Sequence, residues 1–270
     1  MSVLLQISDT HFGTERPAVA DALVAFAARL APALVVLSGD ITQRATVAQF
    51  TAARAFCDRL RAPLLAIPGN HDIPLFNPLA RLLWPYARHQ QAFGAELEPA
   101  HATPDWLVLG VKTTRRWRHQ HGQVSPAQIE QVAQRLRGAQ AGQMRVVVVH
   151  QPVAVPTPRD ARDLLHAHEP AVRAWAAAGA DVIAGGHIHL PYVLPLHTLH
   201  EGLARRIWCV QAGTAVSNRL RREAGNSVNV LRHDAGHTAQ VERWDYRDAS
   251  QDFALAACQA LALDRGGAHV

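Results

Sequence analysis

Short runs dominated by apolar residues alternate with longer amphipathic segments over the first two-thirds of the chain. Such runs are typical of strands buried on both faces of a sheet, and they predict strands at residues 3–7, 33–37, 64–67, 106–111, 145–149 and 181–184. Apolar residues at helical spacing predict the intervening helices at residues 17–30, 46–60, 78–93, 125–136 and 160–178, with an interruption at Pro85. This alternation predicts an α/β fold.

The pattern changes after residue 189. Residues 190–245 contain successive strand-like runs separated by turns, and the Ala- and Leu-rich residues 251–263 predict a final helix. We therefore expect two packed mixed β-sheets flanked by helices, a four-layer αββα sandwich, in a single domain spanning residues 1–270. Residues 73–93 are the candidate for a small cap or insertion on that domain.

The composition is that of a globular protein with a sizeable core. Of 270 residues, 49% are apolar, and no apolar run approaches the ~18 residues of a membrane span, nor does the start resemble a signal peptide. Three cysteines without CxxC spacing suit a reducing compartment, so we expect a cytoplasmic protein. The net charge of +5 is spread along the chain and does not by itself indicate nucleic-acid binding. The segment 253–263 could form a homodimer contact.

Polar groups follow five of the predicted strands at the points where the strands end. Because ligands bind at the carboxyl ends of strands in α/β sheets, we expect these groups to meet at one edge. They are Ser8-Asp9-Thr10-His11, Gly39-Asp40, Gly69-Asn70-His71-Asp72, His150-Gln151 and Gly185-Gly186-His187-Ile188-His189.

Carboxylate, imidazole and carboxamide groups in this number favour a metal site. The candidate ligands are Asp9, His11, Asp40, Asn70, His150, His187 and His189. Seven donors exceed what one ion needs, and a bridging carboxylate at Asp40 would let two ions share them. Two-metal sites of this kind catalyse phosphoryl displacement. The donor types do not choose among Mn, Fe, Zn and Mg.

The same groups resemble the signature of the calcineurin-like metallophosphoesterases. Its five blocks match, in order, Asp9-x-His11, Gly39-Asp40, Gly69-Asn70-His71-Asp72, His150 and Gly186-His187-x-His189. The stretches 211–215 and 226–231 also resemble the small bacterial branch of that family, which includes the class III cyclic-nucleotide phosphodiesterases.

The resemblance implies a role for each matching residue. Asp9, His11 and His189 would hold the first of two divalent ions, with Mn or Fe favoured. Asn70, His150 and His187 would hold the second, and Asp40 would bridge the two. His71 would contact the substrate phosphate, together with Asn70, and act as general acid. Asp72 would either orient His71 or support the loop. A bridging hydroxide would be the nucleophile.

The implied function is hydrolysis of a small phosphodiester, such as a 3′,5′-cyclic nucleotide. One alternative is another phosphoester or pyrophosphate, namely a nucleotide-sugar lipid, a phospholipid headgroup or a nucleic-acid end, although a nucleic-acid partner is not expected. A different class of alternative is a scaffold that kept the fold without catalysis, which should have lost ligands or His71; none is missing.

Three peripheral features leave alternatives open. The basic, aromatic loop 115–121 is either a rim that grips an anionic substrate or a solvated loop. Asn218 and Arg219 could face the site from the second sheet. Trp84 and Tyr86 are expected in the core, as are three further tryptophans, Trp106, Trp175 and Trp208.

Overall fold

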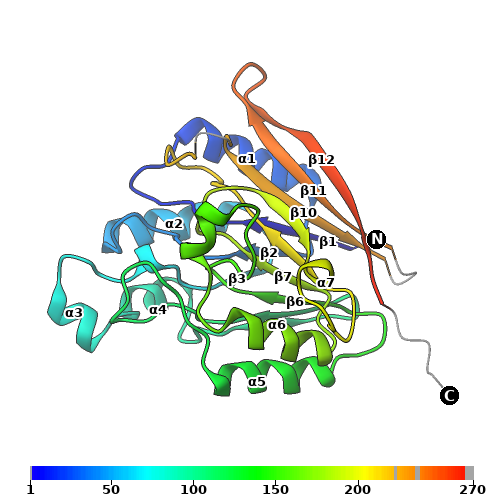
Figure 1. Cartoon of the computed structure of the whole chain (residues 1–270). Coiled ribbons are helices and arrows are strands. Elements are labelled where there is room, and N and C mark those ends of the chain that lie inside the picture. The colour runs from blue at the N-terminus through cyan, green and yellow to red at the C-terminus, as the bar shows by residue number, and fades with distance from the viewer. Residues whose placement is uncertain (1, 222–223, 235–237, 265–270) are drawn as a thin grey trace.

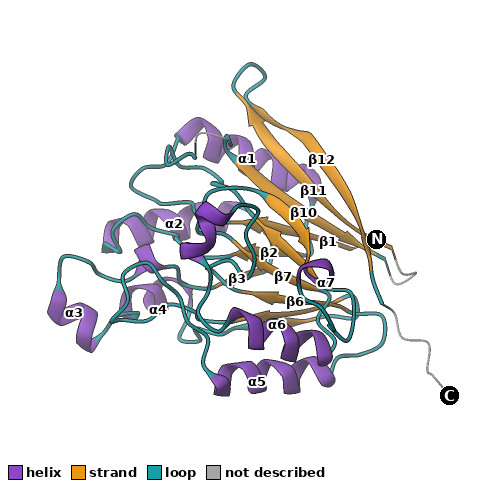
Figure 2. Cartoon of the chain, in the orientation of Figure 1, coloured by secondary structure: helices purple, strands orange, loops and turns teal. Residues whose placement is uncertain are grey.

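Two six-stranded sheets form the centre of the molecule, and helices cover their outer faces (Figures 1 and 2). This computed structural model describes residues 2–221, 224–234 and 238–264. The strand orders are β12-β11-β10-β1-β2-β3 in the first sheet and β4-β5-β6-β7-β9-β8 in the second. The expected sandwich of two mixed sheets is confirmed.

The first sheet combines parallel and antiparallel pairs around β1. Parallel pairing joins β1 to β2 and β2 to β3, whereas β10, β11 and β12 are antiparallel to their neighbours. Its strands are β1 (Ser2–Ile7), β2 (Leu34–Leu37), β3 (Leu64–Ala66), β10 (Ser227–His233), β11 (Thr238–Arg247) and β12 (Asp252–Ala262).

The second sheet has a parallel centre with antiparallel edge strands. Strands β5, β6, β7 and β9 run parallel, while β4 and β8 pair antiparallel at the two edges. The strands are β4 (Ala100–Ala102), β5 (Trp106–Gly110), β6 (Met144–Val148), β7 (Val182–Gly185), β8 (Tyr192–Pro195) and β9 (Trp208–Gln211).

The apolar residues of the central strands pack into two core layers, one on each face of the sheet. In β2, Leu34 and Val36 join the cluster between the sheets, while Val35 and Leu37 join the cluster under the helices of the first sheet. Side chains alternate between the faces of a strand, so a strand covered on both faces has no polar position. The helices are α1 (Pro17–Leu30), α2 (Val47–Arg59), α3 (Pro78–Leu83), α4 (Ala87–Phe93), α5 (Pro126–Arg137), α6 (His168–Ala177) and α7 (Leu196–Leu199), with 3₁₀ turns at Asn70–Asp72 and Pro158–Asp163.

The predicted final helix is wrong, because residues 252–262 form strand β12. Alanine and leucine are strong helix formers, yet here they pair antiparallel along the whole of β11. Phe253 and Leu261 are buried in the two clusters on opposite sides of the sheet. Ladder hydrogen bonds and this burial outweigh the local preference.

Two further segments depart from the prediction. The helix expected over 160–178 is divided into a 3₁₀ turn (Pro158–Asp163) and α6, because Leu165 is buried between them and its amide donates to the carbonyl of Pro152. In the strand meander of residues 190–245, residues 196–199 form the short helix α7 instead of extending β8. His237, expected in a strand, lies outside the described residues.

The candidate cap contains two short helices, α3 and α4, joined at the predicted interruption. Trp84 follows α3 and is 63% exposed, so its expected core position is wrong. No residue of α3 is buried, which leaves its apolar side chains without a core to join. Among the described residues, no helix is long and apolar enough to cross a membrane.

Candidate metal centre

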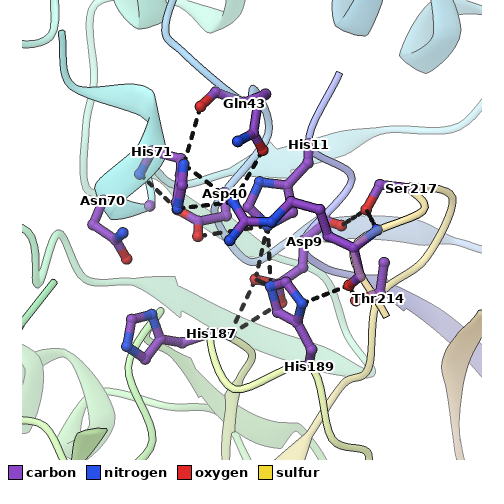
Figure 3. Close-up of polar contacts among 12 residues, drawn as sticks. Asp9, His11, Asp40, Gln43, Asn70, His71, His187, His189, Thr214 and Ser217 are labelled. Carbon is purple, nitrogen blue, oxygen red and sulfur yellow. Dashed lines mark hydrogen bonds and ion pairs between the residues drawn. The ribbon is translucent and has the colours of Figure 1, made fainter. Parts of the chain in front are cut away.

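The candidate ligands come together at one edge of the sandwich, where strands of both sheets end (Figure 3). The loops after β1, β2 and β3 supply residues from the first sheet, and those after β6 and β7 supply residues from the second. All seven expected donors belong to sets of neighbouring side chains. They are Asp9, His11, Asp40, Asn70, His150, His187 and His189.

The first set is formed by Asp9, His11 and His189. His189 Nε2 lies 3.1 Å from His11 Nε2 and 3.4 Å from Asp9 Oδ1. Two donors that each sit about 2.1 Å from one ion are about 3.0–3.4 Å apart in octahedral or tetrahedral geometry. The first set therefore fits a shared cation.

The second set is formed by Asn70, His150, His187 and the carboxylate of Asp40. His150 Nε2 lies 3.2 Å from both Asn70 Oδ1 and Asp40 Oδ1. His187 Nδ1 is buried and has no hydrogen-bond partner among the described residues, so it can serve as a ligand atom. These separations also fit one ion.

Asp40 lies between the two sets. Its Oδ1 faces His150, while its Oδ2 lies 3.7 Å from His11 Nε2. The sequence predicted this carboxylate as the bridge, and the structure places one oxygen toward each set. A further grouping of His11, Asp40 and His71 is also compact enough to hold an ion.

Five of the seven candidate ligands have left-handed backbone conformations, which are uncommon for residues other than glycine. They are Asp9, His11, Asp40, His187 and His189, with φ between 41° and 77°. Each lies beyond a strand end, where a left-handed residue redirects the next side chain. Because of these turns, the two-residue spacing of Asp9 and His11 does not place both on the same face of a strand.

Hydrogen bonds from the back of the site orient two imidazoles. His150 Nδ1 donates to the carbonyl oxygen of Ser38 at 2.9 Å, and His189 Nδ1 donates to that of Arg219 at 2.6 Å. In both rings Nε2 is therefore the atom turned to the ligand cluster. This second layer of contacts is the usual support of histidine ligands.

Charges at the site shift several pKa values. Burial raises the pKa of Asp9, but the hydrogen bond and charge of His189, with a contribution from His150, bring it down to about 2. Burial lowers the pKa of His150, but the neighbouring Asp40 outweighs it and raises the pKa to about 9. Burial lowers the pKa of His11 to about 3. Against the effect of burial, neighbouring histidines likewise hold the pKa of Asp40 well below its usual range, so both carboxylates are ionised, as ligands must be, whereas His150 has to lose a proton when an ion binds.

The loop with Asn70 and His71 packs directly on the Asp40 loop. A Cβ at Gly69 would overlap the backbone nitrogen of Asp40, so the approach requires glycine. The amide of His71 donates to Asp40 Oδ1 at 2.8 Å. These contacts fix the position of the predicted general acid relative to the predicted bridge.

Asp72 supports these two loops and makes no described contact with the His71 ring. Its buried carboxylate accepts from the amides of Gly69, Ile41 and Thr42 and from the Thr42 hydroxyl, at 2.8–3.0 Å. Of the two roles that the resemblance left open, these contacts favour loop support.

A polar pocket of about 510 Å³ opens over the ligand cluster. His71 lines it, and the ring is held by the backbone carbonyl of Gln43, which lies 3.0 Å from Nδ1. Arg219 Nη1 lies 3.1 Å from His71 Nε2 and donates to Gln43 Oε1. The sequence raised Arg219 as a candidate only, and its guanidinium lies on the pocket wall against the His71 ring.

The sequence missed the remaining charged residues of the pocket wall. They are Arg159, Asp160, Arg162, Asp163 and Arg221. Most lie in the 3₁₀ turn that was predicted as the start of a helix. Of the loop 115–121, Gln120 reaches the pocket wall. This favours the rim interpretation at one position.

Comparison with known proteins identifies the family of this chain. The sequence model for calcineurin-like phosphoesterases matches residues 2–191. The chain belongs to that family. Beyond the matched residues, β8 and β9 complete the second sheet and β10 to β12 complete the first.

Two solved structures of this family's fold class resemble the chain over most of its length. A dimetal phosphatase from Danio rerio has a TM-score of 0.67 and 13% identity, covering 97% of this chain and 99% of the other. A purple acid phosphatase from yellow lupin has a TM-score of 0.72 and 11% identity, covering 97% of this chain and 53% of the other. No curated protein matches the sequence significantly. At these identities the likeness establishes the fold.

Proposed function

We propose that this chain is a phosphoesterase dependent on two divalent cations. The observation that carries the proposal is the convergence of seven donor side chains from five loops into two sets around Asp40. Family membership and the dimetal phosphatase neighbour support it. Manganese or iron are the ions to test first, with zinc and magnesium as alternatives, because imidazole and carboxylate donors accept all four.

The ligand roles follow the two sets. Asp9, His11 and His189 would hold one cation, Asn70, His150 and His187 would hold the other, and Asp40 would bridge the two. When bound, the cations supply a water of lowered pKa and neutralise charge on the phosphoryl oxygens. The ionised carboxylates and the support behind His150 and His189 prepare the site before the ions arrive.

His71 is the proposed general acid. The backbone carbonyl of Gln43 accepts the Nδ1–H of His71, so Nε2 is the ring nitrogen available to a substrate. Nε2 now accepts from Arg219 Nη1 at 3.1 Å, so it must be released from that contact and protonated before it can donate its proton to the leaving oxygen as the phosphorus–oxygen bond breaks. The hydrogen bond from the backbone amide of His71 to Asp40 Oδ1 keeps this residue close to the bridging carboxylate.

Arg219 is the proposed contact for a phosphoryl oxygen. Its guanidinium lies beside the His71 ring and lines the pocket, and Gln43 holds Nη1 in place. A fixed guanidinium can donate two parallel hydrogen bonds to a phosphate, which a lysine cannot reproduce. Positive charge here stabilises the negative charge that grows during phosphoryl transfer.

A small phosphodiester, with a 3′,5′-cyclic nucleotide as the first candidate, is the proposed substrate. The pocket volume of about 510 Å³ accommodates a nucleotide-sized molecule. The resemblance of residues 211–215 and 226–231 to the cyclic-nucleotide branch supports the same class.

A phosphoester or pyrophosphate with a second anionic group is the alternative. The arginines on the pocket wall favour it, since Arg159, Arg162 and Arg221 lie there in addition to Arg219, with Arg221 paired to Asp160 and Arg162 to Asp163. A cyclic diester carries one negative charge and needs fewer cations around it.

Turnover assays on metal-loaded protein test the proposal. The chain is treated with chelator, reconstituted with Mn²⁺ or Fe²⁺, and assayed with cyclic AMP, an aryl phosphodiester, an aryl phosphomonoester and a nucleoside diphosphate. We expect turnover of at least one diester, and a bound metal content near two ions per chain. Turnover of the diphosphate alone would select the alternative.

Asp40→Asn is the matched inactive control. Asparagine tolerates the left-handed conformation at this position, so the backbone is preserved while the bridging charge is removed. We expect this variant to bind fewer ions and to lose activity. A variant with wild-type activity would refute the assigned bridge, and no turnover by any loaded form would refute the proposed function.

A further inference from the structure

Six large apolar side chains gather on the surface beside the pocket, and we call them the apolar patch. They are Phe76, Leu79, Leu82, Leu83, Trp84 and Trp117, each 50–78% exposed. The patch holds six of the ten exposed large apolar residues among the described residues. Scattered exposed apolar residues need no explanation, but a concentration like this one marks an interaction surface.

Hydrogen bonds join the two segments that carry the patch. Arg81, on α3, donates to the carbonyls of Arg116 and Arg118 at 2.7 and 2.6 Å, and Arg116 donates to that of Leu82 at 2.7 Å. These three bonds hold Trp117 next to α3. The patch is therefore one surface built from two parts of the chain.

Helix α3 lies at the edge of the molecule, away from both sheets (Figure 1). None of its residues is buried, so the apolar side chains of the patch contribute little to the protein's own core. Their exposure to water is unfavourable by roughly 25 cal/mol per Å². A partner that covers the patch would recover this free energy.

Cations dominate the two segments that carry the patch, and the nearest acidic side chains, Glu96 and Glu98, line a pocket together with Trp117. Residues 73–95 and 111–124 contain no Asp or Glu, and their cations are Arg81, Arg88, Lys112, Arg115, Arg116 and Arg118. Arg44 lies over the ring of Phe76, 5.1 Å from its centre. A second copy docked symmetrically on this surface would bring two sets of like charges together. The positive charge of these segments favours an anionic partner.

From these observations we propose that the apolar patch docks the protein on an anionic lipid bilayer. Leucine, phenylalanine and tryptophan surrounded by arginines are typical of protein surfaces that insert into the headgroup region. Single-stranded nucleic acid also binds aromatic and basic surfaces, but by base stacking, which Leu79, Leu82 and Leu83 cannot provide. The leucines favour the bilayer.

The patch and the pocket are connected by neighbouring residues of the chain. Gln120, on the pocket wall, is three residues from Trp117, and Arg44 directly follows Gln43, which holds His71. Membrane binding stands apart from the proposed phosphoesterase activity, because no patch residue lines the pocket. Each can fail without the other.

Vesicle sedimentation with the full chain tests this proposal. The vesicles are phosphatidylcholine alone, or phosphatidylcholine with one-third phosphatidylglycerol. We expect binding at least about tenfold stronger to the anionic vesicles, because each arginine near such a surface contributes about fivefold. High salt should weaken it. The triple variant F76S/W84S/W117S should bind the anionic vesicles at least about tenfold more weakly, with no change in turnover of a water-soluble substrate.

The matched control is L199S/L255S, which removes two similarly exposed leucines outside the patch. It should bind vesicles like the wild type, and unchanged melting temperatures would show that both variants are folded. Equal vesicle binding by the triple variant and the wild type would overturn the proposal. So would patch-dependent binding of a single-stranded oligonucleotide without vesicle binding, or a dimer in light scattering that the triple variant abolishes.

Discussion

Replacing His71 by alanine separates its proposed role as general acid from a role as metal ligand. The ring is compatible with both, since it lines the pocket and also forms a compact group with His11 and Asp40. As an acid, the ring supplies a proton to the leaving oxygen and holds no ion. His71→Ala should then keep the wild-type metal content.

The expected loss follows from the proton transfer that the variant cannot make. General acids contribute about 10²- to 10⁴-fold to the rate, which corresponds to about 2.7–5.5 kcal/mol of transition-state stabilisation. Gln43 fixes the ring at Nδ1, so removal of the ring leaves no other described imidazole in its place. A water molecule can only partly replace it.

The assay compares two diesters with different leaving groups. An aryl diester releases a stable phenolate that needs little protonation, whereas an alkyl or cyclic nucleotide diester releases a basic alkoxide. The loss in kcat should therefore be large for the alkyl diester and small for the aryl one. His121→Ala, which removes an exposed histidine outside the pocket wall, is the matched control. Equal losses on both substrates, or a fall in metal content, would refute the assignment.

Three further changes test other parts of the structure. Gly69→Ala should lower the free energy of unfolding by about 1–3 kcal/mol and lower the metal content, because its Cβ meets the backbone of Asp40. Thermal unfolding measures the change in stability, and Gly138→Ala, whose Cβ has space, is the control. Burial lowers the pKa of His89 to about 4, so its neutral form stabilises the fold above about pH 6.5, and this stability is lost as the pH falls toward 4. Between pH 6.5 and 4, the free energy of unfolding measured in urea should fall by about 3 kcal/mol more in the wild type than in His89→Leu. The same pH dependence of the free energy of unfolding in both proteins would contradict this. Arg219→Gln should reduce kcat/KM about 10- to 100-fold at unchanged metal content, and a wild-type value would exclude a phosphoryl contact.

The hydrophobic pattern predicted the central strands well because burial on both faces leaves a clear mark on the sequence. Strand β2 is a continuous apolar run and β6 is one apart from Arg145, and their alternate apolar residues pack on two different core layers. The same reasoning failed for β12. Its alanines and leucines favour a helix locally, and only pairing with β11 makes a strand of them.

The candidate site was also predicted only in part from the sequence. The candidate metal ligands have chemically distinctive side chains and come directly after strands, so the sequence indicated all seven, and the structure brings them together. The pocket wall was not predicted, because arginine and aspartate in the segment Pro158–Asp163 look like any surface residues. Trp84 shows the opposite error, since a large apolar residue was assumed to be buried.

The sequence by itself determined the layered α/β fold, the family and the candidate metal ligands, because each depends on residue type and local spacing. The tertiary structure decided how those donors are aimed, through five left-handed backbone positions and the close contact at Gly69. It also decided which side chains beyond the ligands surround the pocket and which apolar ones stay outside the core. Those outcomes depend on contacts between distant segments, and no local pattern records them.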